Sequence, residues 1–404
     1  MTEIAANNRL NPYRRQRWIA LGILILALMT RLTVFRGDPR ENDESLYRAL
    51  VEQLANGHGY TLQGHPILDE PWVIRPQYEQ PLFFHPPGGL ILFWSFVSVF
   101  GQAGFGLAQW AMFALFYYAG LRLIRQTAGR LDDRSFGIVC LTVGFSPIMA
   151  HVSTHYWLDG PQTAWVMLCT TMFVESCRRR SSWHGALAGL ALAAACWTKL
   201  HAVLALPGIV LVGWACQRRV VWGPALSMTV IGGLLSLPWP IWQWMVLGSP
   251  FPSWAGRPHP DLVAQNEYIH FLTVVRPWWI YFVLLPSVMS TLPAAVGMLW
   301  TQRPTGRRRF VAISLALWIC LIVGVIAGLG AIGYSKLLRY VILVTPAELC
   351  LWALALRTWK RSQRRVPFVV WLLLALEWAH GLATLVVLFR TDLLIPLLWP
   401  TSRS

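Results

Sequence analysis

The sequence predicts an all-α fold, a polytopic bundle of transmembrane helices, and two observations indicate this class. Of the 404 residues, 55% are hydrophobic and 13% are charged, and the mean hydropathy is +0.48. A soluble protein carries about twice that share of charge. Apolar runs near the ~20 residues that cross a bilayer recur from end to end. We therefore expect one transmembrane domain over residues 1–404, with about eleven spans and no soluble C-terminal domain.

The net charge of +16 arises largely from basic clusters at the ends of the apolar runs. Six clusters hold 22 of the 34 Lys and Arg residues, at 9–17, 122–134, 178–180, 218–219, 303–309 and 357–365. Because basic residues gather on the cytoplasmic side of membrane proteins, this pattern favours anionic lipid over nucleic acid as the partner. It predicts a cytoplasmic N-terminus and an external C-terminus. Arg outnumbers Lys and the outer loops lack Asn-x-Ser/Thr sites, which favours a bacterial cytoplasmic (inner) membrane.

The first apolar run, 18–35, is expected to be an uncleaved first span, because no small-residue cleavage site follows it. Residues 36–104 then form an outer loop, which this orientation places in the periplasm. Within it, 43–56 has helical spacing, since Leu46, Leu50 and Leu54 fall on one face, and we expect a helix along the membrane surface. The run 88–100 is too short to cross comfortably, so we expect a second juxtamembrane helix.

The remaining apolar runs supply the other spans. We expect them at 105–121, 135–150, 160–177, 183–197, 203–216, 222–247, 277–300, 310–329, 338–356 and 366–389. Dividing the runs differently gives about twelve or thirteen. Residues 198–201 form the turn of a tight pair of spans, so Lys199 is expected to lie below the outer surface.

The first outer loop concentrates the acidic residues. It holds eight of the eighteen carboxylates: Asp38, Glu41, Asp43, Glu44, Glu52, Asp69, Glu70 and Glu79. On a helix, neighbouring residues point about 100° apart. One of Asp43 and Glu44 is therefore expected to face a reaction and the other to hold a structural partner. A carboxylate near an apolar surface serves well as a general base. The alternative is a solvated loop whose acids only mark the start of a helix.

Other candidates lie where apolar segments meet the outer side. Asp159 enters a span and is either a functional acid or an ordinary N-cap followed by Pro161. His85 begins the short helix at 88–100. Three cations near apolar segments suit a lipid phosphate, and the alternative is snorkelling of helix-end side chains: Lys199, Lys336 and Arg339.

The sequence predicts no metal or organic cofactor. The seven cysteines lie in or beside apolar runs and are expected to act as small hydrophobic residues. His151 and His155 could share a helical face, but no third ligand lies near in sequence. Phosphate-binding loops, dinucleotide fingerprints and hydrolase motifs are absent from the sequence.

Five short stretches, in order along the chain, resemble the GT-C fold membrane glycosyltransferases, and most of all the protein O-mannosyltransferases and bacterial aminoarabinose transferases. They are Asn42-Asp43-Glu44-Ser45-Leu46-Tyr47, Phe84-His85-Pro86-Pro87-Gly88, Asp159-Gly160-Pro161, Trp197-Thr198-Lys199 and Lys336-Leu337-Leu338-Arg339-Tyr340. The resemblance implies inverting transfer of a hexose or pentose from a polyprenyl-phosphate donor to a hydroxyl acceptor at the outer face.

The same resemblance implies roles for individual residues. Asp43 is the expected general base, with Glu44 as its structural neighbour, and Asp159 is the second acidic position. His85 stands where many relatives carry a Lys against the donor phosphate, so the phosphate role there would need a protonated imidazole. The remaining cations on the phosphate side are Lys199, Lys336 and Arg339. Because the lipid phosphate is already a good leaving group, no metal is expected.

Two other functions stay open at this point. A transporter or lipid flippase could use Asp43, Asp159 and Lys199 as polar sites within the membrane, although the sequence shows no pair of related halves. The second open function is that of a non-catalytic protein with the same fold. The residues do not identify the sugar, and a lipid, a glycan or a protein acceptor each fits.

Overall fold

The computed structural model describes residues 12–36, 38–39, 42–73, 75–251, 277, 279–333, 338–362 and 366–389. These residues form helices and connections without strands, as predicted. In this part of the chain, six helical stretches are long and apolar enough to cross a membrane: Ala103–Thr127, Leu200–Gln217, Trp222–Leu247, Arg307–Ala331, Arg339–Arg361 and Phe368–Leu388. The all-α membrane class is therefore confirmed, while the predicted number of spans stays a prediction.

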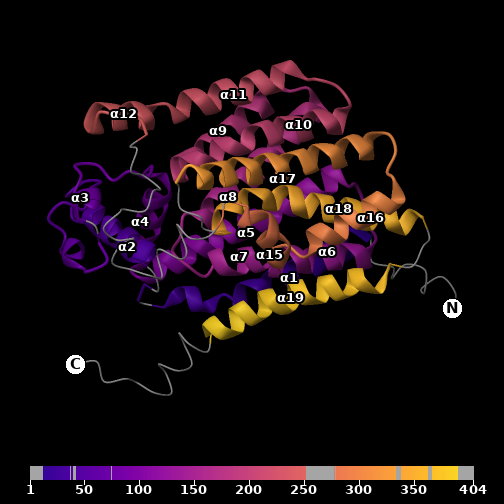
Figure 1. The fold of residues 1–404 in the computed structure, drawn as a ribbon, viewed down its shortest axis with the longest axis horizontal. Coiled ribbons are helices and arrows are strands. Elements are labelled where there is room, and N and C mark those ends of the chain that lie inside the picture. The colour runs from indigo at the N-terminus through magenta and orange to yellow at the C-terminus, as the bar shows by residue number, and fades with distance from the viewer. Residues whose placement is uncertain are drawn as a thin grey trace, which may run out of the picture.

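The chain begins with two apolar helices and a group of short outer ones. The first are α1 (Pro12–Met29) and the 3₁₀ helix η1 (Leu32–Phe35). The outer group follows: α2 (Asn42–Ala55), η2 (Pro66–Asp69), α3 (Arg75–Tyr78) and α4 (Gly88–Phe100). The predicted helices 43–56 and 88–100 are thus confirmed. Figure 1 shows α2, α3 and α4 gathered at one end of the long bundle.

The bundle itself consists of long helices packed side by side (Figure 1). Its central members are α5 (Ala103–Thr127), α8 (Asp159–Arg179), α9 (Ser182–Thr198) and α18 (Thr345–Arg361). Around them lie α10 (Leu206–Gln217), α17 (Arg307–Ala331) and α19 (Phe368–Phe389). Many large apolar side chains of α11, α17 and α19 are exposed, as expected for helices that face lipid.

Three of the predicted spans are each divided into two α-helices. They are α6 (Asp133–Phe145) with α7 (Pro147–Val152), α11 (Trp222–Ser236) with α12 (Pro238–Leu247), and α15 (Ile280–Val288) with α16 (Thr291–Gln302). Pro147 and Pro238 each begin a new helix, because proline lacks the amide hydrogen that would continue the old one. The third division lies at Met289 and Ser290.

Glycines bring α9 and α11 into close contact. A Cβ atom on Gly189 of α9 would lie 2.7 Å from the carbonyl oxygen of Met228 and 3.0 Å from the amide nitrogen of Gly232. One turn earlier, a Cβ atom on Gly185 would lie 2.6 Å from the carbonyl oxygen of Pro224. Only glycine at these positions allows the two backbones to approach this closely, as in other membrane helix pairs.

Two 3₁₀ segments complete the end of the bundle beside the outer helices. η3 (Leu200–Ala205) follows α9, and η5 (Leu338–Val344) precedes α18. α8 contacts both segments, and α4 contacts both α2 and α9. Residues from widely separated parts of the sequence therefore meet at this end of the molecule.

Candidate active site

Asp43 and Arg339 form an ion pair at the outer end of the bundle. Asp43 lies in the first turn of α2, where acidic residues favour the positive end of the helix dipole. Its Oδ2 accepts a hydrogen bond from Nη2 of Arg339 on η5. The Asp43 side chain is 34% exposed and that of Arg339 is 13% exposed. The acid is thus accessible, while its cationic partner is largely enclosed.

Asp159 and Lys199 form a second ion pair, which is buried. Nζ of Lys199 lies 2.9 Å from each carboxylate oxygen of Asp159. Their side chains are 1% and 4% exposed, respectively. The burial predicted for Lys199 is therefore observed. Leu158 occupies the N-cap position of α8 and provides no side-chain cap, so the described contacts of Asp159 favour the ion pair over the capping interpretation.

The two ion pairs influence each other electrostatically. Burial raises the pKa of Asp43, but the charges of Arg339 and Lys199 and the Arg339 hydrogen bond outweigh it, so the pKa lies below its ordinary value. Burial, followed by the Lys199 charge, lowers the pKa of His85 to about 3. At neutral pH Asp43 is therefore ionised and His85 is neutral. The phosphate role of His85 stays a prediction.

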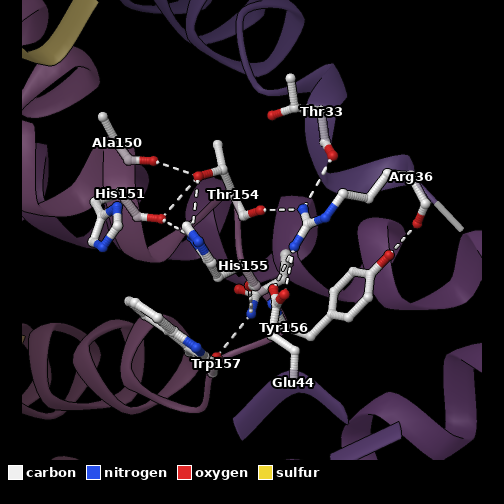
Figure 2. A network of polar contacts seen from close by, with 10 residues as sticks. Thr33, Arg36, Glu44, Ala150, His151, Thr154, His155, Tyr156 and Trp157 are labelled. Carbon is white, nitrogen blue, oxygen red and sulfur yellow. Dashed lines mark hydrogen bonds and ion pairs between the residues drawn. The ribbon is translucent and has the colours of Figure 1, made fainter. Parts of the chain in front are cut away.

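Glu44 is fully buried and belongs to a network of polar contacts with residues of other segments (Figure 2). Nη2 of Arg36 lies 2.5 Å and 2.6 Å from its two carboxylate oxygens. The backbone amide of Tyr156 donates to Oε1 of Glu44 at 2.7 Å, and Nη1 of Arg36 donates to the carbonyl of Thr154 at 2.7 Å. These bonds tie the first turn of α2 to the connection that leads into α8 and Asp159.

Trp157 provides an aromatic platform for Arg339. The Arg339 guanidinium carbon lies 4.3 Å from the centroid of the Trp157 ring, within cation–π range. The His155 ring is stacked with Trp157 at a centroid distance of 4.3 Å. In Figure 2, Nδ1 of His155 donates to the carbonyl of His151, at 2.8 Å. The imidazoles of His151 and His155 are thus packed beside each other, 4.6 Å apart.

Three buried nitrogens near these pairs have no hydrogen-bond partner among the described residues: Nε of Arg339, Nε1 of Trp157 and Nε2 of His201. Arg339 binds Asp43 through Nη2 only, so Nε remains for another acceptor. The His201 ring lies 6.3 Å from the ring of Tyr340, the residue that follows Arg339, so it lies beside the same cluster. An oxyanion that enters the cluster would find these groups, and Lys199, ready to donate.

Among the described residues, no group of three or more His, Cys, Asp and Glu side chains could hold a metal ion. Lys336 lies outside the described residues. Of the other predicted site residues, the structure brings together Asp43, Asp159, His85, Lys199 and Arg339, and it places Glu44 in the adjoining network.

The sequence prediction did not select Arg36, Tyr156, Trp157 or His201. One signal pointed to Arg36, because the basic clusters predict that it lies on the outer side, where basic residues are depleted. The other three look like ordinary interfacial or turn residues in sequence, and only the path of the chain reveals their positions.

The chain resembles solved structures throughout its length. It aligns with ArnT from Cupriavidus metallidurans bound to undecaprenyl phosphate at 18% identity, with a TM-score of 0.61, over 92% of this chain and 77% of that one. It aligns with the Archaeoglobus fulgidus oligosaccharyltransferase in complex with zinc and sulfate at 13% identity, with a TM-score of 0.56, over 90% of this chain and 53% of that one.

The sequence itself matches no protein-family model and no curated protein. At these identities the structural likeness shows the fold. Both solved structures are membrane glycosyltransferases of the GT-C fold. The helices and the apolar stretches of the described residues agree with that fold class. The fold of this chain is that of the GT-C membrane glycosyltransferases.

Proposed function

We propose that this protein is an inverting membrane glycosyltransferase, which moves a hexose or pentose from a polyprenyl-phosphate donor to a hydroxyl group. The observation that carries the proposal is the juxtaposition of Asp43 with Arg339 beside the Asp159–Lys199 pair, at the outer end of a GT-C fold. An accessible carboxylate next to enclosed cations suits a reaction in which a hydroxyl loses a proton as a phosphate departs.

Asp43 is the general base in this proposal. Its oxygens lie at a partly exposed position, and it is ionised at neutral pH, so it is able to accept the proton of the acceptor hydroxyl. Inversion requires that the hydroxyl attack the anomeric carbon from the face opposite the phosphate. The base and the phosphate-binding cations must therefore lie on opposite sides of the sugar.

Arg339 and Lys199 bind the donor phosphate. Each is paired with a carboxylate in this structure, so the cluster of two acids and two cations has no net charge. An incoming phosphate competes with Asp43 for the guanidinium of Arg339, whose Nε is still unpartnered among the described residues. Donor binding would thus release Asp43 from its ion pair and increase its basicity at the moment the base is needed.

The surrounding residues position these groups. Glu44 fixes the first turn of α2 through Arg36 and Tyr156, and Asp159 orients the Lys199 ammonium. His85, neutral here, hydrogen bonds to the donor phosphate or acceptor rather than acting as a cation. Lys336 adds a further phosphate-side charge. No metal is required, because two cations already neutralise a leaving group that departs readily.

The proposed location is a bacterial inner membrane, with the outer helix group on the periplasmic side and a cytoplasmic N-terminus. The basic clusters at the helix ends support this orientation. A lipid, a glycan or a protein each supplies the hydroxyl that the chemistry needs.

The test is transfer of radiolabelled sugar from a polyprenyl-phosphate-linked pool in membranes that contain equal amounts of wild type or Asp43→Asn. The variant is expected to lose transfer while remaining folded. Asp69→Asn is the matched control, because Asp69 lies in the same loop with its side chain 72% exposed, and it should retain full transfer.

Full transfer by Asp43→Asn would remove the base role. If wild type transferred no sugar from any common polyprenyl donor, the enzyme function itself would fail, and transport or a non-catalytic role would take its place.

A further inference from the structure

Two carboxylates that the proposed mechanism does not use converge on one residue inside the bundle. Glu348 on α18 and Glu377 on α19 both have 0% exposure. The backbone amide of Thr291, the first residue of α16, lies 2.5 Å from Oε2 of Glu377. The Thr291 hydroxyl is hydrogen bonded to Oε1 of Glu348. We call Glu348 and Glu377 the acid pair.

Neither member of the acid pair has a cation within ion-pair distance in the described part of the chain. Their remaining oxygens, Oε2 of Glu348 and Oε1 of Glu377, are buried without hydrogen-bond partners among those residues. Two carboxylates that share one apolar site cannot both stay ionised without a counter-ion, because each charge is desolvated and repels the other. A proton on one acid removes the repulsion and the desolvation penalty of that acid, and the other acid keeps its charge.

The hydrogen bonds indicate which acid carries the proton. A backbone amide only donates, and it stands at the positive end of α16, so it favours an ionised Glu377. A hydroxyl also accepts, so the contact between Thr291 and Glu348 is compatible with a protonated carboxyl. Thr345, one turn before Glu348 on the same helix face, is buried, and its hydroxyl has no partner among the described residues. No hydrogen bond joins that hydroxyl to Glu348, so Thr291 is the hydroxyl partner of Glu348 among the described residues.

We propose that Glu348, Glu377 and Thr291 form an intramembrane proton-binding site, in which Glu348 carries one proton and Glu377 is ionised. The site holds the start of α16 against α18 and α19. This start lies directly after the break that divides α16 from α15. Because α18 continues from η5, which carries Arg339, the acid pair also anchors the helix that holds the proposed phosphate-binding cation.

Infrared spectroscopy of the purified protein tests the proposal without relying on transfer activity. Wild type at neutral pH should show the carbonyl stretch of a protonated carboxylic acid that exchanges slowly with heavy water. Glu348→Gln should lose this band, and Glu377→Gln should keep it. Glu175→Gln is the matched control, because Glu175 is also buried but is paired with Arg178 and Arg179, and it should leave the band unchanged. Absence of the band in wild type would overturn the proposal.

Thermal unfolding in detergent separates a proton from a bound metal cation. Glu348→Gln should unfold like wild type, because a neutral amide replaces a neutral acid of the same shape. Glu377→Leu should raise the unfolding equilibrium constant about tenfold or more, since the Thr291 amide loses its acceptor. If sodium or potassium ions stabilised wild type and Glu348→Gln abolished that effect, the site would hold a metal cation instead. These measurements stand whether or not the glycosyltransferase proposal holds.

Discussion

Arg339 donates a hydrogen bond to Asp43, although 296 positions separate the two residues along the chain. Burial raises the pKa of Asp43, whereas the Arg339 charge and hydrogen bond, with the charge of Lys199, lower it further than burial raises it. Arg339→Gln should therefore move the acidic limb of the pH profile of kcat/KM to higher pH. In wild type, kcat should begin to fall at a higher pH than kcat/KM as the solution is made acidic. The reason is that the bound donor phosphate would draw Arg339 away from Asp43 and so raise the pKa of that carboxyl.

Initial rates of sugar transfer over a range of pH check this prediction. Arg75→Gln is a suitable control, because that guanidinium pairs with exposed Asp69 in the same outer region. If kcat and kcat/KM of wild type fell at the same acidic pH, Arg339 would remain paired with Asp43 throughout turnover.

Glu44→Gln should destabilise the outer loop and reduce transfer. The substitution converts a bidentate ion pair with Arg36 into a single neutral contact in a fully buried position. We expect a loss of about 2 kcal/mol in the free energy of unfolding. Glu52→Gln, at a carboxylate that is 44% exposed and pairs with Arg48, should cost less than about 1 kcal/mol. Chemical unfolding in detergent measures the free energy of unfolding of both variants. Equal losses for the two would contradict the prediction that the buried ion pair of Glu44 stabilises the loop more than the exposed pair of Glu52.

The Asp159–Lys199 pair should show strong coupling in a double-mutant cycle. Removing one partner leaves the other as a buried uncompensated charge, so Lys199→Met should cost about 3–5 kcal/mol of unfolding free energy. Lys199→Met combined with Asp159→Asn should recover part of that loss, because no unpaired charge remains. Unfolding of the single and double variants measures the coupling. Simple addition of the two single effects would show that the pair does not act as a unit.

His85 should make stability fall in acid. The pKa of His85 is about 3 in the folded protein, against an ordinary value of 6.5, because burial and the Lys199 charge disfavour its protonation. The unfolded chain therefore binds more protons than the folded chain between those two values. The stabilisation is fully present above pH 6.5 and is lost as pH falls toward about 3.

Unfolding measured across that interval should show a shallower dependence on pH for His85→Asn than for wild type. His58→Asn, at an exposed imidazole in the same loop, should leave the wild-type slope unchanged. If the stability of His85→Asn depended on pH as steeply as that of wild type, groups other than His85 would cause the loss of stability in acid.

Gly189→Ala should destabilise the contact between α9 and α11. Its new methyl group would lie 2.7 Å from the carbonyl oxygen of Met228, so the helices must separate. Gly233→Ala on α11 provides the control, since a Cβ atom there meets nothing within 4 Å. Because alanine favours helix, Gly233→Ala should be neutral or stabilise by up to about 1 kcal/mol. Thermal unfolding in detergent distinguishes the variants, and the opposite order would contradict the packing argument.

Periodicity and length predicted the outer helices α2 and α4 closely, because both are bounded by strong turn or proline signals. They did not predict the division at Ser290, since the helix start at Thr291 depends on Glu377 from another helix. The divisions at Pro147 and Pro238 had a visible signal in each proline.

The candidate site was predictable residue by residue only where a charged side chain lies in an unusual setting, as for Asp43, Asp159, Lys199 and Arg339. Their pairing was not predictable, because helix packing, not sequence spacing, decides which acid meets which cation. For the same reason Trp157 looked like one interfacial tryptophan among many, and only the structure places it against Arg339.

The long separation between Asp43 and Arg339 has a consequence for biogenesis. A ribosome completes Asp43 early and Arg339 only after most of the helices have been synthesised, so a nascent chain holds the acid without its cationic partner. The cluster that we assign to catalysis closes only when η5 docks against α8. A partly inserted chain therefore lacks the candidate site.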